Sequence, residues 1–155
     1  MQVNQIFQAL GEQGFDDVFG TLTVTKLKTY KLYETLKARA HLPKLNVAGL
    51  KKVRPRFWER LVAGDEDLAG DLAQAVLISN LDMIVEVLDF LEVPHHDGFF
   101  EKDFDATEIL KDDWRDRAYK NFQGKYPGPL LVFYLNHLAM ETTKAEDLFT
   151  PADAK

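Results

Sequence analysis

The chain contains no cysteine, and Ser79 is its single serine among 155 residues. The absence of cysteine excludes disulfides, thiolate metal ligands and cysteine nucleophiles. Ser79 lies inside an apolar stretch without a Gly-x-Ser-x-Gly motif, which argues against a serine hydrolase. Phosphate-loop, His-Glu-x-x-His and complete EF-hand motifs are also absent. We therefore expect no bound cofactor and favour a protein that is not an enzyme.

A long uninterrupted hydrophobic run is missing as well. The most apolar stretch, residues 75–91, is interrupted by Asp82, Glu86 and Asp89. Acids are costly in hydrocarbon, so we expect no membrane span. Residues 1–5 lack the basic and apolar regions of a signal peptide. With the absence of cysteine, these features predict a soluble protein of the cytoplasm.

What is present is typical of a globular domain. Hydrophobic residues make up 46% of the chain and charged residues 28%, and 18 residues are aromatic. This composition suffices to build a hydrophobic core without disulfides or metals. We predict a single helical domain over residues 1–143. Residues 144–155 form a polar segment that we expect to be a frayed tail.

Apolar residues recur at helical spacing through most of the chain, which predicts an all-α fold. We expect a compact bundle of five to seven helices around a long buried central helix over about residues 66–93. The predicted helices cover residues 4–10, 25–40, 46–53, 56–63, 66–93, 106–122 and 129–142, and residues 14–20 are predicted to be a linker. Asn46 is the expected N-cap of the third helix.

Charge is distributed unevenly along the chain. Residues 23–63 contain eleven Lys or Arg and two acids, a balance of +9, whereas residues 65–113 contain fifteen acids and two lysines, a balance of −13. The basic segment could bind an anionic partner. Alternatively, the two segments neutralise each other within the fold.

Residues 44–60 are the candidate partner-binding or anion-binding segment. Their cations are interleaved with Phe57 and Trp58, as in proteins that contact phosphates and stack bases. The predicted break at Arg54-Pro55 allows a helix-turn-helix. The acidic isoelectric point, near 5.2, argues against nucleic acid, and core packing is the alternative role for both aromatics. The candidate cations are Lys51, Lys52, Arg54, Arg56 and Arg60.

Three histidines are candidate metal ligands: His95, His96 and His137. Imidazoles with nearby carboxylates can bind zinc or act as general bases. His95 and His96 are adjacent in a predicted turn, so further ligands such as Glu101 or Asp103 would have to come from elsewhere. The alternatives are an exposed turn for His95 and His96, and a hydrogen-bonded pair of His137 with Glu141, four residues later.

Asp82, Glu86 and Asp89 share one face of the predicted central helix. This acidic stripe can be the helix face that meets water. It can instead pair with arginines such as Arg54, Arg56 or Arg60, or place two carboxylates for acid–base chemistry.

From the sequence we expect a non-enzymatic helical protein that acts through protein–protein contacts, including self-association as a homodimer. One alternative is a metal-binding protein or metal-dependent hydrolase that uses the histidines. The second is nucleic-acid binding through residues 44–60, which the acidic isoelectric point disfavours.

Overall fold

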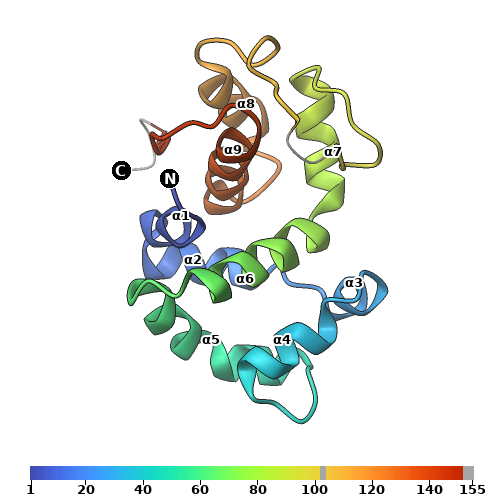
Figure 1. Ribbon diagram of the computed structural model, residues 1–155, viewed down its shortest axis with the longest axis vertical. Coiled ribbons are helices and arrows are strands. Elements are labelled where there is room, and N and C mark those ends of the chain that lie inside the picture. The colour runs from blue at the N-terminus through green and yellow to red at the C-terminus, as the bar shows by residue number, and fades with distance from the viewer. Residues whose placement is uncertain (102–103, 152–155) are drawn as a thin grey trace. The chain divides into compact units, whose positions relative to one another are not determined.

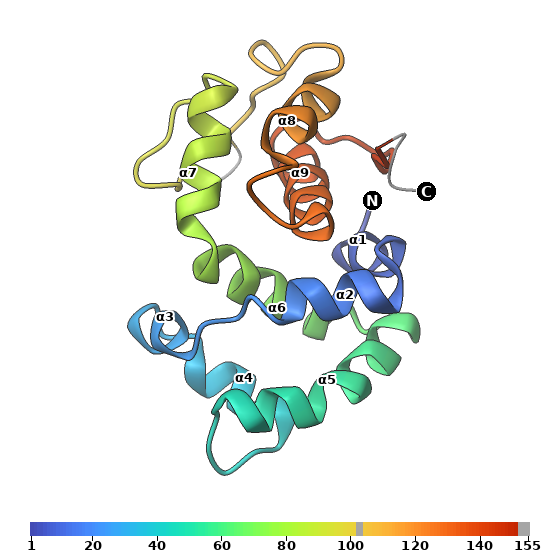
Figure 2. The same cartoon turned by 180° about the vertical axis from the view of Figure 1, so that it is seen from behind.

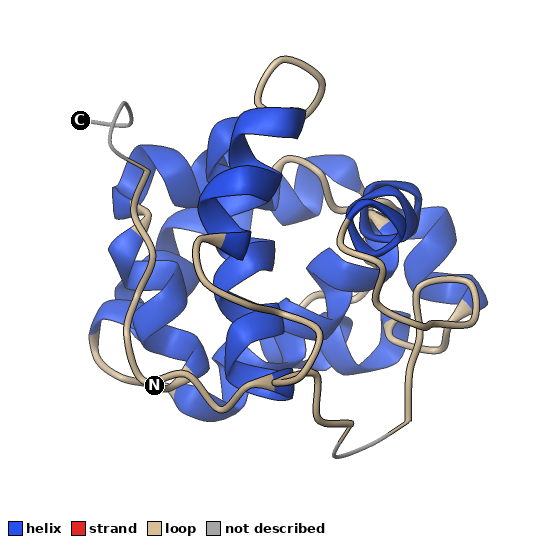
Figure 3. Ribbon diagram, turned by 90° about the horizontal axis from the view of Figure 1, so that it is seen from above, coloured by secondary structure: helices blue, strands red, loops and turns tan. Residues whose placement is uncertain are grey.

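The structure is a computed structural model that describes residues 1–101 and 104–151. All the regular secondary structure in these ranges is helical, as Figure 3 shows. The predicted all-α class is confirmed. Nine helices are found there instead of five to seven: two predicted helices are each divided in two, two others are joined into one, and the predicted linker over 14–20 is largely helical.

The chain divides into two compact units. Unit 2 contains residues 2–80, and unit 1 contains residues 81–155 together with Met1. The single domain expected over residues 1–143 stays a prediction. The division changes how charge is grouped: unit 2 has eleven basic and nine acidic residues, a net charge of +2, whereas unit 1 has a net charge of −8.

Unit 2 is built on α6, which contacts α1, α3, α4 and α5 (Figure 1). Its buried face carries Leu68, Leu72 and Val76. The six helices of this unit are α1 (Val3–Ala9), α2 (Gly11–Phe19), α3 (Val24–Thr29), α4 (Tyr33–Ala40), α5 (Val47–Val62) and α6 (Glu66–Ser79).

Local capping signals fix the start of two of these helices. The predicted N-cap Asn46 accepts a hydrogen bond from the Gly49 amide at 2.7 Å. Asp65 caps α6 in the same way and accepts from the Leu68 amide at 3.0 Å. Side-chain oxygens at this position satisfy amides that have no partner within the helix.

A remote carboxylate caps α1. Glu66 Oε1 accepts a hydrogen bond from the Val3 amide at 2.8 Å, and Oε2 accepts from the Asn4 amide at 3.1 Å and from Asn4 Nδ2 at 2.6 Å. Glu66 is itself the first residue of α6. One side chain therefore joins the start of α1 to the start of α6.

The predicted central helix over 66–93 is wrong as a single element. It is divided at Asn80 into α6 and α7 (Leu81–Phe90). The backbone of Asn80 leaves the helical region, and its Nδ2 donates to the Val76 carbonyl at 2.8 Å and to Thr21 Oγ1 at 2.9 Å. Asparagine side chains compete with the backbone for such bonds, which explains the interruption.

Three helix boundaries in unit 2 also differ from the prediction. Residues 14–20 belong largely to α2, and the predicted helix over 25–40 is divided at Lys31, which has a positive φ of 65°. Residues 47–62 form one helix instead of two, with Pro55 inside it. Proline removes one intrahelical hydrogen bond. Pro55 is exposed, while Val53 and Phe57 on either side of it are buried, and this packing holds α5 together across it.

Phenylalanines of α1 and α2 form much of the core of unit 2. Phe15 is 1% exposed, and its ring centroid lies 5.8 Å from that of Phe7, 5.6 Å from that of Phe19 and 5.4 Å from that of Trp58. Aromatic pairs at these distances add stabilisation beyond the area they bury. The aromatic residues expected in a linker are therefore core residues of a helix.

Unit 1 contains α7, α8 (Trp114–Phe122) and α9 (Gly128–Thr142). α8 and α9 lie side by side, as Figures 1 and 2 both show. The helix predicted over 106–122 begins only at Trp114, and the described residues between α7 and α8 are turns and loops. α9 matches its prediction and is buried along most of its length.

No single helix among the described residues is long and apolar enough to cross a membrane. Taken together, α6 and α7 have the length and apolar composition of a membrane span, but a break separates the two helices.

Candidate functional site

The candidate cations all lie on α5, and the structure separates them into two groups. Lys51, Lys52 and Arg56 are exposed and form no ion pair with a described residue. Arg54 and Arg60 are half-buried and paired. The interleaved aromatics face the core: Phe57 is 1% exposed, and half-buried Trp58 contacts Phe15. The core alternative is therefore correct for Phe57, whereas Trp58 packs at the edge of the core.

The paired arginines bind acids from unit 2. Arg54 Nε lies 3.0 Å from Asp16 Oδ1, an ion pair whose geometry does not align as a hydrogen bond. Arg60 binds Asp65 through Nε at 3.0 Å and Nη2 at 2.9 Å. The hydrogen bond from the Leu68 amide and the bond from Arg60 lower the pKa of Asp65. Acids of the fold thus neutralise only part of the basic segment.

Two adjoining concavities of unit 2 are lined by cations. One of about 260 Å³ is bordered by Arg39, His41, Arg56 and Arg60, and one of about 340 Å³ shares Arg39, His41 and Arg60. Arg39 is not a free cation, because its Nε donates to Asp71 Oδ2 at 2.7 Å, and this bond raises the pKa of Arg39. Acids at two of the three arginines offset much of the positive charge there.

The three histidines do not form a common site in the described residues. His95 Nε2 lies 2.7 Å from Asp89 Oδ1, and His95 Nδ1 accepts from the Gly98 amide at 3.0 Å. His96 is in the exposed turn, where its backbone pairs with that of Phe99. No group of three histidine, aspartate or glutamate side chains in ranges 1–101 and 104–151 could hold a metal ion. Asp103, a possible extra ligand, lies outside the described residues.

His137 is buried on α9. Its Nδ1 lies 2.6 Å from Glu141 Oε1, and its ring stacks on Phe133. This is the hydrogen-bonded pair expected as the alternative to a metal ligand. Tyr134 on the same helix has a buried hydroxyl without a hydrogen-bond partner among the described residues, and burial raises the pKa of Tyr134.

The acidic stripe of α7 pairs within unit 1. Glu86 accepts hydrogen bonds from Lys125 and Tyr126, Asp89 binds His95, and Asp82 is exposed. The suggested pairing with arginines of α5 is wrong, because the partners come from the turn between α8 and α9 and from the turn after α7. The stripe therefore connects α7 to neighbouring turns.

The Glu86 contacts predict a pH dependence of stability. The hydrogen bonds from Lys125 and Tyr126 lower the pKa of Glu86. A carboxylate with a lowered folded pKa stabilises the protein above its unfolded pKa, about 4.3, and loses this effect as pH falls through the folded value. We expect Glu86→Gln to lower the melting temperature at about pH 7 and to have little effect near about pH 2. A Glu86→Gln effect of equal size at both pH values would contradict this assignment.

The same contacts act in the opposite sense at alkaline pH. Burial and the bond to Glu86 raise the pKa of Tyr126 to about 12. Between about pH 10 and this value the unfolded chain loses the phenolic proton and the folded chain keeps it, so stability falls as pH rises.

Residues 145–151 make polar contacts with α8 and α9. The Arg115 guanidinium donates to the Asp147 carbonyl at 3.0 Å and to Asp147 Oδ2 at 2.7 Å. Asn136 on α9 binds the backbone of Phe149 through both ends of its amide. Pro151 is buried. These contacts differ from the frayed tail expected from residue 144; residues 152–155 lie outside the described residues.

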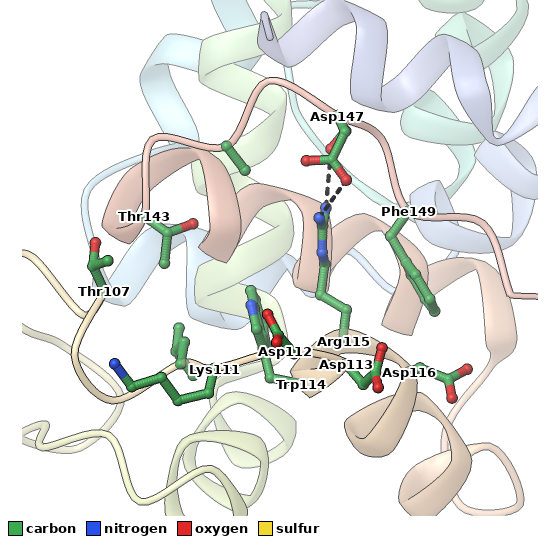
Figure 4. A pocket seen from close by; sticks show the side chains of 12 residues that line it. Thr107, Lys111, Asp112, Asp113, Trp114, Arg115, Asp116, Thr143, Asp147 and Phe149 are labelled. Carbon is green, nitrogen blue, oxygen red and sulfur yellow. Dashed lines mark hydrogen bonds and ion pairs between the residues drawn. The ribbon is translucent and has the colours of Figure 1, made fainter.

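A pocket of about 480 Å³ adjoins this segment. Figure 4 shows Arg115 extending from α8 toward Asp147, with the Phe149 side chain beside it and Asp112, Asp113 and Asp116 along the opposite border. The Arg115 guanidinium lies 5.8 Å from the ring centroid of Trp114. None of these residues is predicted from the sequence to form a site. The one residue that could have indicated it is Asn136, because a polar side chain within an apolar helix needs a buried partner.

Comparisons with protein-family models, with curated protein sequences and with solved structures find no match to this chain.

Proposed function

We propose that this is a non-enzymatic helical protein that acts through protein–protein contacts, and that its interface is the exposed side of α5. We call this surface the α5 outer face. It consists of the exposed residues Val47, Ala48, Lys51, Lys52, Pro55, Arg56, Glu59 and Val62, so it carries three cations and one acid.

The observation that carries the proposal is the combination of exposed cations and exposed valines along the exposed half of one helix. Val47 is 74% exposed and Val62 is 55% exposed. Lys51, Lys52 and Arg56 lie between them without ion pairs to described residues. Apolar contacts with a charged surround are typical of protein interfaces, in which charge sets specificity and association rate. An acidic protein surface is the complementary partner.

Three features favour a protein partner over a nucleic acid. Phe57 is buried and not available to stack on a base, and half-buried Trp58 packs on Phe15 and presents only part of its ring. α5 is continuous through Pro55, so the helix-turn-helix suggested by the sequence is not formed. The chain as a whole is acidic, with a net charge of −6.

The partner we propose is a second copy of this chain. Unit 1 has a net charge of −8 and supplies the acidic surface that the α5 outer face requires. Association between such surfaces weakens with salt, because the screening length falls below about 10 Å above roughly 0.1 M ionic strength.

Self-association followed by analytical ultracentrifugation at low and moderate salt tests this proposal. We expect association that weakens with salt, and Lys51→Glu/Lys52→Glu should weaken it by about tenfold or more. Lys26→Glu/Lys31→Glu is the matched control, because both lysines are exposed on unit 2 and the net charge changes equally. This control should associate like the wild type.

Two results would overturn the proposal. One is a wild-type protein that stays monomeric at every salt concentration. The other is binding of duplex DNA or single-stranded RNA at micromolar concentration, with a steep salt dependence and loss in Lys51→Glu/Lys52→Glu. That result would assign the α5 outer face to nucleic acid. Non-specific binding has a Kd of about 10⁻⁴ to 10⁻⁶ M at physiological salt, so the loss in Lys51→Glu/Lys52→Glu is the decisive part of the result.

A further inference from the structure

Residues 145–151 lie on α8 and α9 of unit 1 as an irregular segment that bends at Asp147, and we call the surface that they cover the groove. They follow α9 and pack back on α8 and α9 through contacts to both backbone and side chains. No helix or strand is formed in this segment. Groups on α8 and α9 therefore supply the hydrogen bonds that regular structure would otherwise provide.

The backbone contact is made by a fully buried side chain. Asn136 is 0% exposed, its Nδ2 donates to the Phe149 carbonyl at 3.1 Å, and its Oδ1 accepts from the Phe149 amide at 2.7 Å. An amide side chain that binds both backbone groups of one residue selects peptide backbone without regard to its side chain. Asn136 Oδ1 also accepts from Arg115 Nη1 at 3.1 Å, so Asn136 Nδ2 is the buried group that loses its partner when no peptide is present.

Two side chains of the segment add selectivity. Asp147 binds Arg115, whose side chain is 14% exposed, through a charge-assisted hydrogen bond of 2.7 Å. The Phe149 ring lies 6.2 Å from the Tyr119 ring and 6.0 Å from the Arg115 guanidinium. The groove thus binds an acid at the bend of the segment and, two residues later, an aromatic ring. In this chain the sequence read is Asp147-Leu148-Phe149.

The segment is held at the surface and by few bonds. The side chain of Asp147 is 76% exposed, and Leu148 is 40% exposed. The pocket of about 480 Å³ opens along the same residues (Figure 4). Release of the segment would leave α8 and α9 packed on each other and would expose Arg115 and Asn136 to another peptide.

We propose that this groove recognises Asp-x-Phe segments of partner proteins that bend at the aspartate, and that residues 145–151 occupy it as a competing ligand of the same chain. A tethered ligand acts at an effective concentration of about 1 mM. If the free segment has a Kd of about 0.1 mM, the tether weakens binding of a partner segment by about tenfold. Weakening the contacts of the tethered segment therefore makes the groove available to a partner segment.

A labelled peptide with the sequence of residues 145–151, followed by fluorescence anisotropy, tests the proposal. The full-length variant Asp147→Ala/Phe149→Ala should bind this peptide at least about tenfold more tightly than the wild type does. The same peptide with alanine at both positions is the control and should not bind. Adding Arg115→Ala to the variant should reduce its affinity for the unchanged peptide by about tenfold or more.

Circular dichroism shows whether each variant is folded. If the double variant unfolds, Asp147→Ala alone replaces it, because the Asp147 side chain is largely exposed and the Phe149 packing is retained. A folded variant that does not bind the peptide overturns the proposal, and so does equal binding of the control peptide. A wild-type dimer that is abolished by Asp147→Ala/Phe149→Ala also overturns it, because the ligand would then be the same segment of a second copy.

Discussion

Replacement of Leu88 by alanine is expected to lower the free energy of unfolding by about 2–5 kcal/mol. Leu88 is 0% exposed on α7, where Met83, Ile84 and Val87 are also buried. Truncation removes apolar area from the core and leaves a cavity that the neighbours fill only in part. Urea denaturation of the wild type and Leu88→Ala measures the difference.

Asp82→Ala is the matched control on the same helix. Asp82 is exposed, so its replacement should change the free energy of unfolding by less than about 1 kcal/mol. Equal losses in Leu88→Ala and Asp82→Ala would contradict the orientation of α7 in the structure. Glu86→Ala is not a suitable control, because Glu86 binds Lys125 and Tyr126.

The parts of the fold that the sequence predicts are those set by local patterns. Asn46 precedes a helix and accepts from an amide three residues later, so its role is visible within four residues of sequence. α9 begins at Gly128, directly after Pro127, and residues 130–135 are all apolar apart from the Tyr134 hydroxyl. Helical periodicity of this kind is sufficient to assign the all-α class.

The errors occur where distant residues decide the local structure. Asn80 ends α6 with a bond to Thr21, 59 residues earlier, so the sequence around Asn80 reads as one continuous apolar helix. Pro55 predicts a break, but burial of Val53 and Phe57 keeps α5 intact. Tertiary packing overrides the local preference in both cases.

The same reasoning explains what could be foreseen of the candidate sites. The sequence identifies the basic segment, but only the fold assigns Asp16 to Arg54 and leaves Lys51 and Lys52 exposed. Arg115 meets Asp147 across 32 residues, and this pairing has no signal in the spacing of the chain. Sequence patterns therefore identify the charged surface better than the peptide groove.

Replacement of Glu66 by alanine is expected to lower the free energy of unfolding by about 2–3 kcal/mol. A hydrogen bond to a charged group contributes about 1.5–3 kcal/mol net of the competing bonds to water, and solvent reduces this contribution at the half-buried Glu66. Glu66 accepts three hydrogen bonds from Val3 and Asn4 at the start of α1. Without the carboxylate, two backbone amides of α1 lose their partner and α1 loses a direct connection to α6. Chemical denaturation measures the loss.

Two comparisons separate this cap from a general charge effect. Asp67→Ala removes the same charge from an exposed neighbouring position and should cost less than about 0.5 kcal/mol. Glu66→Gln keeps the shape of the side chain and one acceptor oxygen, so its loss should lie between those of the two alanine variants. Amide hydrogen exchange gives the local readout: Val3 and Asn4 should exchange faster in Glu66→Ala and remain unchanged in Asp67→Ala. Unchanged exchange at Val3 and Asn4 in Glu66→Ala would mean that Glu66 does not cap α1 in solution.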